Sequence, residues 1–179
     1  MIGSQVPSDL YLHLARAPSS HLQKLMLTGA RPAISSLVGQ DYRGYNRLYL
    51  LSLIGARTFL KGFARAPDGH AEGWNVRVKQ NGLAGPWIPA PKAGRYGFFR
   101  VGQVDPESND NVYLHAVLFD YAAGRGHRLS PLRLLRDYVV SVGSGPDEVL
   151  LGRAYLAVWR WRVPVSFFLL ERQNGIGET

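Results

Sequence analysis

Hydrophobic and polar residues follow two different periods along this chain. Over the first 36 residues the period is helical: Ser8 can cap a helix formed by DLYLHLARA, and Ser20 can cap a second helix formed by HLQKLML. Gly29 offers the second helix a stop, and Pro32 prevents its continuation. Residues 1–36 are therefore predicted to form a helical N-terminal segment.

From residue 37 onward the pattern is typical of an antiparallel β protein, because short apolar or alternating runs are separated by turn-forming sequences such as APDGH and GSGPD. The dipeptide Asn81-Gly82 predicts a tight hairpin turn. Residues 48–54 are compatible with a helix or with a strand. The predicted strands cover residues 37–46, 57–64, 73–80, 95–103, 112–122, 135–142, 149–158 and 163–172.

Several of these strands are apolar on both faces. In VYLHAVLFDYA, His115 and Phe119 lie on one face and Leu118 on the other, and the closing run VSFFLLER is apolar on both sides too. Such a sheet needs cover on both faces, and two short helices are too few to provide it. A closed barrel of about eight strands solves this, and its interior is wide enough for side chains or one small ligand. We therefore expect one mainly β domain, with the barrel over residues 37–172 and a tail over 173–179.

The stretch GQDYRGYN in the first predicted strand and the closing FFLLER resemble the calycins, the group of lipocalins and fatty-acid-binding proteins. In that group a Gly-x-Trp motif opens the first strand, and its aromatic ring closes one barrel end beneath an arginine of the last strand. Here the spacing is Gly-x-x-Tyr, with Tyr42 as the aromatic residue and Arg172 as its partner, and Asp137-Tyr138 resembles a pair in the second motif. The resemblance implies a closed barrel and a cation–π contact between Tyr42 and Arg172.

Composition removes several classes of protein. A chain of 179 residues without cysteine suits one domain and has neither disulfides nor a thiol nucleophile. The longest apolar run, residues 48–56, is far shorter than the roughly 20 residues of a membrane-spanning helix. The first ten residues lack the regions of a secretory signal, so we expect a cytoplasmic protein. The glycines match no nucleotide-binding motif and the five histidines are not spaced as metal ligands, so the sequence indicates neither a cofactor nor a metal.

The net charge of +8 would suit an acidic partner, but the basic residues are scattered, which does not favour nucleic-acid binding. The one cluster with aromatic residues is WRWR, from Trp159 to Arg162. We predict a turn there, whose tryptophans either cover a barrel end or contact an anionic membrane or a partner protein. The proline-rich GPWIPAPKAG presents Trp87 as a second contact residue, and the oligomeric state stays open.

Tyrosine and phenylalanine on the predicted strands favour an apolar cavity with a few polar groups. We therefore expect the protein to bind a small lipophilic molecule inside the barrel. The candidate lining residues, taken from alternate strand positions, are Tyr42, Tyr96, Phe98, His115, Phe119 and Tyr138.

Two other functions stay open. The first is a cyclase or isomerase on the same barrel, with His115 as general acid or base and Tyr96 or Tyr138 as a hydrogen-bond donor to an oxyanion. His115 can equally be a half-buried residue that bonds a tyrosine hydroxyl or a backbone carbonyl. The second is an interaction module with a packed core. Asp120 is expected to be exposed, or paired with Arg100 or Arg136.

Overall fold

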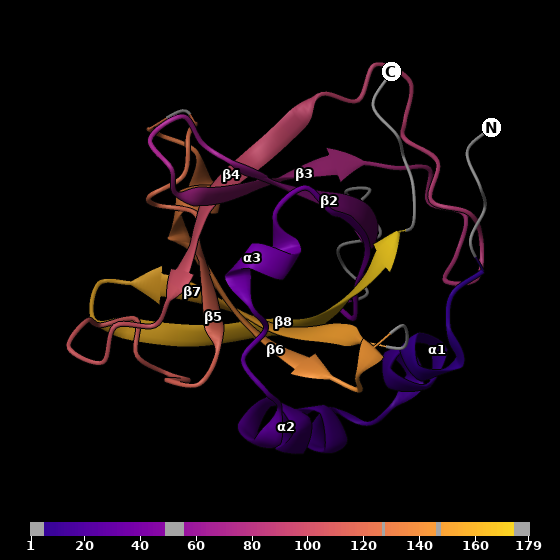
Figure 1. The fold of residues 1–179 in the computed structure, drawn as a ribbon, viewed down its shortest axis with the longest axis horizontal. Coiled ribbons are helices and arrows are strands. Elements are labelled where there is room, and N and C mark those ends of the chain that lie inside the picture. Colours follow the sequence, from indigo (N-terminus) through magenta and orange to yellow (C-terminus); the bar gives the residue numbers. More distant parts are fainter. Residues whose placement is uncertain (1–5, 49–55, 127, 146–147, 174–179) are drawn as a thin grey trace.

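The computed structural model describes residues 6–48, 56–126, 128–145 and 148–173. It is a closed antiparallel barrel in which each strand pairs with its neighbours in sequence and β1 pairs with β8 (Figure 1). The strands are β1 (Asp41–Asn46), β2 (Thr58–Arg65), β3 (Ala71–Arg77), β4 (Arg95–Gln103), β5 (Val117–Asp120), β6 (Leu135–Val142), β7 (Val149–Val158) and β8 (Trp161–Gln173). The helices are α1 (Asp9–Arg16), α2 (Ser19–Thr28), α3 (Ile34–Leu37) and the 3₁₀ helix η2 (Pro131–Leu134).

The predicted barrel of eight strands is confirmed, and β4, β6 and β7 have the predicted bounds. Two strands are shorter than predicted. Residues 34–37 form α3, so β1 begins only at Asp41, and residues 112–116 leave the sheet and cover its outer face, so β5 begins at Val117. Apolar residues at such spacings also occur where a short helix or a loop packs against a sheet.

The N-terminal helices were predicted, with one error at a cap. The Ser8 side chain accepts a hydrogen bond from the Tyr11 amide at 3.2 Å and caps α1. Helix α2 begins at Ser19 directly after Pro18, so Ser20 lies inside the helix and is not its cap. Gly29 ends α2 as predicted. Pro18 suits the start of α2, because the backbone N–H that proline lacks is not needed there.

The hairpin turn predicted at Asn81-Gly82 is wrong. Strands β3 and β4 do pair, but residues 78–94 between them form a long loop that Val78 and Pro89 bridge once. Gly82 has the positive φ of 88° that a turn glycine adopts, so the local preference is present without the tight hairpin. The undecided segment 48–54 falls almost wholly on residues 49–55, and the predicted tail on residues 174–179, outside the described part of the chain.

Two apolar cores lie on the two sides of the sheet. The inner core fills the barrel and includes Phe63, Phe99, Phe119 and Phe168. The outer core lies where α1, α2 and two long loops cover the barrel wall, and it includes Tyr113 and other tyrosines. This cover explains why the strands are apolar on both faces. Helices α1 and α2 lie against one side of the barrel in Figure 1.

Helix α3 closes one end of the barrel. Leu37 belongs to the inner core, and the Gly39 amide donates to the Phe63 carbonyl at 2.9 Å. Tyr42 lies at this end and its ring meets the edge of Phe63, 5.4 Å between centroids. Tyr42 lies directly opposite Arg172, so the predicted partners of the first and last strands do meet, but the cation–π contact predicted between them is not among the contacts of the described residues. A hydrogen bond from the guanidinium to the phenolic oxygen links them instead, and Arg172 also bonds the α3 backbone.

Large rings inside the barrel lie directly over glycines. A Cβ atom added to Gly44, Gly73 or Gly152 would come within 2.0 to 2.3 Å of Phe59, Phe99 or Phe168, respectively. Each phenylalanine therefore needs the space that a glycine leaves on the adjacent strand. This packing lets the interior hold several aromatic rings and still keep an open cavity at the other end.

Candidate functional site

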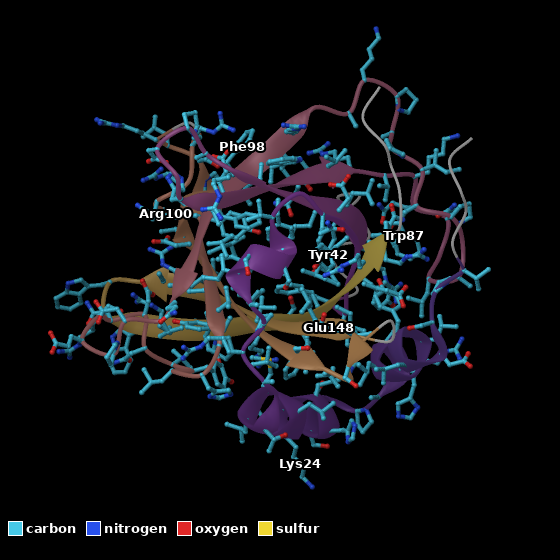
Figure 2. All side chains as sticks on the ribbon, viewed as in Figure 1. Lys24, Tyr42, Trp87, Phe98, Arg100 and Glu148 are labelled. Atoms are coloured by element: carbon cyan, nitrogen blue, oxygen red, sulfur yellow. The ribbon has the colours of Figure 1, made fainter. Side chains whose placement is uncertain are left out.

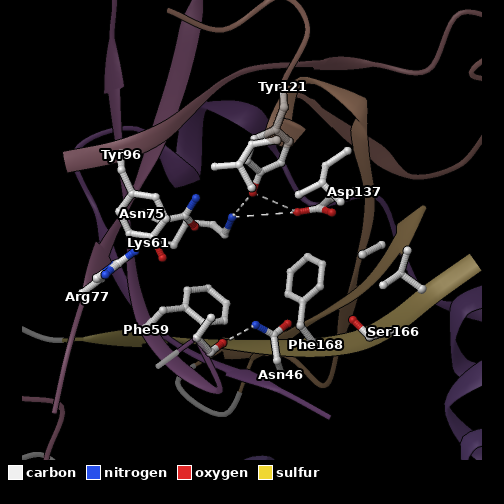
Figure 3. A pocket seen from close by; sticks show the side chains of 15 residues that line it. Asn46, Phe59, Lys61, Asn75, Arg77, Tyr96, Tyr121, Asp137, Ser166 and Phe168 are labelled. Atoms are coloured by element: carbon white, nitrogen blue, oxygen red, sulfur yellow. Dashed lines mark hydrogen bonds and ion pairs between the residues drawn. The ribbon is translucent and has the colours of Figure 1, made fainter. Parts of the chain in front are cut away.

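A cavity of about 320 Å³ lies inside the barrel at the end opposite α3. Its polar groups are Asn46, Lys61, Asn75, Arg77, Tyr96, Tyr121, Asp137 and Ser166. Its apolar walls include Phe59, Leu132, Leu135, Ala154, Val165 and Phe168 (Figure 3). The volume lies at the lower end of the range of about 300 to 1,000 Å³ that is usual for small-molecule sites. The cavity is thus mainly apolar, with a few polar groups that converge on it.

A hydrogen-bonded cluster of Lys61, Tyr121 and Asp137 forms the polar part of this cavity. The Lys61 amine donates to the Tyr121 hydroxyl at 2.9 Å, and that hydroxyl donates to Asp137 Oδ2 at 3.2 Å. The amine and Asp137 Oδ2 are 3.9 Å apart. Figure 3 shows the three groups on one side of the cavity, from β2, the end of β5 and β6.

The surroundings of Lys61 are otherwise aromatic. The residue is only 1% exposed, and its amine lies 4.3 to 5.7 Å from the ring centroids of Phe59, Phe99, Phe119, Tyr121 and Phe168. Ring faces attract a cation, by roughly 0.5 to 2 kcal/mol for each good contact. These rings therefore help to hold the amine in place. They offset only part of the free energy that the ammonium loses when it is buried away from water.

Burial shifts the pKa of both charged groups toward neutrality. Desolvation lowers the pKa of Lys61 to about 8, against an opposing effect of the nearby Asp137. Desolvation likewise raises the pKa of Asp137 to about 6, opposed by Lys61 and by the hydrogen bond from Tyr121. Burial and Asp137 both raise the pKa of Tyr121 well above its ordinary value, so it stays a hydroxyl donor. The cluster can therefore exchange protons near neutral pH.

The remaining polar groups fix the cavity wall. Asn75 donates to the Gly97 carbonyl at 3.2 Å, and Asn46 donates to the Ala56 carbonyl at 2.7 Å. Gly97 has a φ of 56° at the irregularity where β3 and β4 change register. This bulge turns Tyr96 toward the cavity, where Arg77 lies 5.6 Å from its ring centroid.

Three of the six predicted lining residues lie inside the barrel, at different depths. Tyr96 lines the cavity. Phe119 lies deeper, in the inner core beside Lys61, and Tyr42 lies at the closed end. Of these three residues, Tyr96 borders the open space. Phe119 does not, but it packs against Lys61, which does.

The other three predicted lining residues lie on the outer face. Phe98 packs on Trp74 and under Arg125, because the bulge at Gly97 reverses the phase of β4. Tyr138 is buried in the outer core against Tyr113. The predicted phase was therefore wrong at both positions.

His115 lies in the loop before β5, and its Nε2 bonds the Met26 carbonyl of α2 at 2.8 Å. The backbone-carbonyl interpretation of this histidine is therefore confirmed, and its predicted place on the cavity wall is wrong. Asp120 is paired as predicted, since Arg136 lies 3.1 Å from its carboxylate.

Sequence reasoning missed Lys61, Tyr121 and Asp137 as one site. A signal for Lys61 is present in TFLKGF, because strand alternation puts the lysine on the same face as Phe59 and Phe63. An exposed lysine would instead be expected opposite the phenylalanines. The partners of this lysine depend on which strands become neighbours across the barrel, and no local pattern gives that.

The two predicted tryptophan contact sites differ. Trp87 is buried: its indole N–H donates to the Gly44 carbonyl at 3.1 Å, so the prediction that its loop presents it to a partner is wrong. Trp159 and Trp161 are 84% and 62% exposed at the turn between β7 and β8, with Arg160 lying 5.4 Å from both rings.

Comparison of the chain with protein-family models, curated proteins and solved structures found no match. Within the described ranges, no group of three or more His, Asp or Glu side chains is placed to hold a metal ion. Among these same residues, no helix is long and apolar enough to span a bilayer.

Proposed function

We propose that this protein binds a small lipophilic molecule with one polar end inside the barrel. The single observation that carries the proposal is the cavity of about 320 Å³, whose walls are mainly apolar and whose polar cluster lies on one side. An apolar ligand body would pack against Phe59 and Phe168, and its polar end would meet Lys61 and Tyr121. Apolar burial would supply affinity, while the polar cluster would set the orientation.

Filling the cavity should abolish binding while the fold remains. Ala154 lines the cavity from β7, so the ring of an Ala154→Phe variant would occupy the ligand's space. We expect the affinity for the neutral apolar probe N-phenyl-1-naphthylamine, measured by fluorescence titration, to fall by about tenfold or more, equal to about 1.4 kcal/mol. Val165→Phe, from the facing part of β8, should act in the same way.

Ala123→Leu is the matched control, because Ala123 is exposed on the loop after β5. It adds apolar volume without reaching the cavity and should leave probe affinity unchanged. If both cavity-filled variants bind the probe as well as the original chain, the ligand does not occupy this cavity. Native mass spectrometry of the freshly purified protein would then identify any ligand that copurifies elsewhere.

We propose further that the β7–β8 turn attaches the open end of the barrel to an anionic membrane. The exposed apolar residues Val158, Trp159, Trp161 and Leu134 lie around a shallow hollow that Arg128 and other arginines line. Ala154 and Val165 of the cavity lining lie on β7 and β8, the two strands that this turn connects. Aromatic rings beside cations suit the interface of an anionic bilayer, and a lipophilic ligand could enter the barrel from it.

The variant Trp159→Ser/Trp161→Ser should bind vesicles of phosphatidylcholine and phosphatidylserine about tenfold or more weakly than the original chain, because it loses the apolar part of the contact. Flotation of protein with vesicles measures this. Leu27→Ser is the control, since Leu27 is exposed on α2, away from the turn. Equal binding to vesicles of phosphatidylcholine alone, or undiminished binding by the double variant, would contradict the proposal.

A further inference from the structure

We propose that the ligand is an aldehyde or ketone and that Lys61 binds it covalently, as an imine. This inference rests on the proposed function, because it names the chemical class that the same cavity would take. It also assigns the barrel an activity, reversible carbonyl capture, that simple ligand storage does not require.

The first support is the position of the Lys61 amine. It lines the cavity, yet it is only 1% exposed, and five aromatic rings surround it. A lysine normally keeps its ammonium in water and buries only its apolar stem. Burying the amine of a lysine costs free energy, because the charged form loses its water. A buried ionisable group that lies in a cavity beside a specific partner is therefore a candidate for a chemical role.

The second support is the neighbour of this amine. A carboxylate ligand could pair with an ammonium, but here Asp137 already lies 3.9 Å from the Lys61 amine. A second carboxylate would come close to the first one inside a cavity with little water, and like charges repel strongly there. A neutral carbonyl group brings no such repulsion, so the position beside Lys61 favours an aldehyde or a ketone over an acid. The other cation of the lining, Arg77, lies against the Tyr96 ring and not in this cluster.

The third support is the distribution of protons. With its pKa near 8, about one Lys61 in ten is a free amine at pH 7, roughly two orders of magnitude more than for an ordinary lysine. Asp137, with a pKa near 6, can accept and return a proton in the same range. Tyr121 links the two groups by hydrogen bonds and remains a donor.

The reaction balances without any further reagent. The lone pair of the neutral Lys61 amine forms a bond to the carbonyl carbon, and the C=O π electrons move to the oxygen. That oxygen takes a proton from Tyr121, which regains one from the cationic nitrogen, so a neutral carbinolamine forms. Protonated Asp137 gives its proton to the hydroxyl, which leaves as water while the nitrogen lone pair forms the C=N bond, and Asp137 takes back the remaining N–H proton. One amine and one carbonyl compound give one imine and one water, and Asp137 and Tyr121 end in their original protonation states.

Reductive trapping tests this inference. Hexanal and sodium cyanoborohydride at pH 7 should convert Lys61 to a hexylamine, which adds the mass of hexanal less one oxygen atom. Peptide mapping should find Lys61 modified faster than the exposed Lys24, Lys79 and Lys92, by about tenfold or more on account of its larger free-amine fraction. Lys24 points away from the barrel on α2 in Figure 2 and serves as an internal reference.

Two variants separate the chemistry from nonspecific reaction. Lys61→Met/Asp137→Leu removes the buried pair together and should lose the rapid first modification while it keeps its fold. Tyr121→Phe keeps the ring and the lysine but lacks the proton donor, and its trapping rate should fall by about 10². Trapping of Tyr121→Phe at an undiminished rate would overturn the assigned role of the hydroxyl.

The failure of this inference and that of the proposed function give different results. If N-phenyl-1-naphthylamine binds and slows the preferential modification of Lys61 by hexanal, both the imine and the proposed function stand. If the probe binds but Lys61 is modified no faster than Lys24, the imine is overturned and noncovalent binding remains. If the probe does not bind and Lys61 shows no preference, both are overturned.

Discussion

Replacing Asp137 alone with leucine should lower the free energy of unfolding by about 3 to 5 kcal/mol, whereas replacing Asp137 and Lys61 together should not. The single change leaves a buried amine without its carboxylate partner, which is the costly case for an internal ion pair. In Lys61→Met/Asp137→Leu both charges are gone and apolar side chains of similar size fill the space. Such replacements often leave stability unchanged or raise it by about 1 to 4 kcal/mol.

The two single variants should respond to pH in opposite directions. In the folded chain the pKa of Lys61 lies near 8, below its ordinary 10.5, so the cost of holding it charged is present below pH 8 and disappears as the pH rises to 10.5. Asp137 has a folded pKa near 6, above its ordinary 3.8, so its cost is present above pH 6 and disappears as the pH falls to 3.8. Asp137→Leu should therefore recover stability at high pH, and Lys61→Met at low pH.

Urea unfolding followed by tryptophan fluorescence, at several pH values, measures all four members of this cycle. Trp74 and Trp87 are buried and report on the fold. If the double variant is as unstable as Asp137→Leu, the stability of the barrel depends on the lysine itself and not on the pairing of two charges.

Truncating Tyr42 to alanine should cost about 3 to 5 kcal/mol, the usual range for a large aromatic side chain removed from a core. Its ring packs at the closed barrel end against Phe63, and its hydroxyl accepts from Arg172 of the last strand. Tyr42→Phe keeps the ring and should lose only about 0.5 to 1.5 kcal/mol, the net contribution of one hydrogen bond. A urea midpoint that is unchanged in Tyr42→Ala would contradict the closing role of this end.

The architecture could be predicted because it depends on patterns that repeat over many residues. Strands β6 and β7 carry long apolar runs between strong turn sequences, so their bounds followed from composition and period. Unbroken alternation could show which residues share a face, but not which face is the inner one, as Tyr138 of the regular strand β6 shows. One bulge at Gly97 was enough to place Phe98 on the outer face while Tyr96 lines the cavity, and such a bulge gives little warning in a single sequence.

The candidate site was harder to predict than the fold for a related reason. Lys61 and Asp137 are far apart in sequence and lie on strands that are not neighbours, so they meet only across the interior of the closed barrel. The aspartate had been noted for its place beside Tyr138, which faces outward. A single lysine in an apolar strand is usually at the surface, and only its alternation with Phe59 and Phe63 speaks against that here.

Closure of the barrel between β1 and β8 sets an order for synthesis. A ribosome releases the chain from its N-terminus, so pairs of sequence neighbours such as β2 and β3 can form while later strands are still being made. Strand β1 can pair with β2 at once, but its other edge must wait for β8, since Asp41 also pairs with Gln173. Until then the nascent sheet has two open edges, which are templates for pairing with other chains. The interval before β8 emerges is therefore when the edges of this sheet are most open to such pairing.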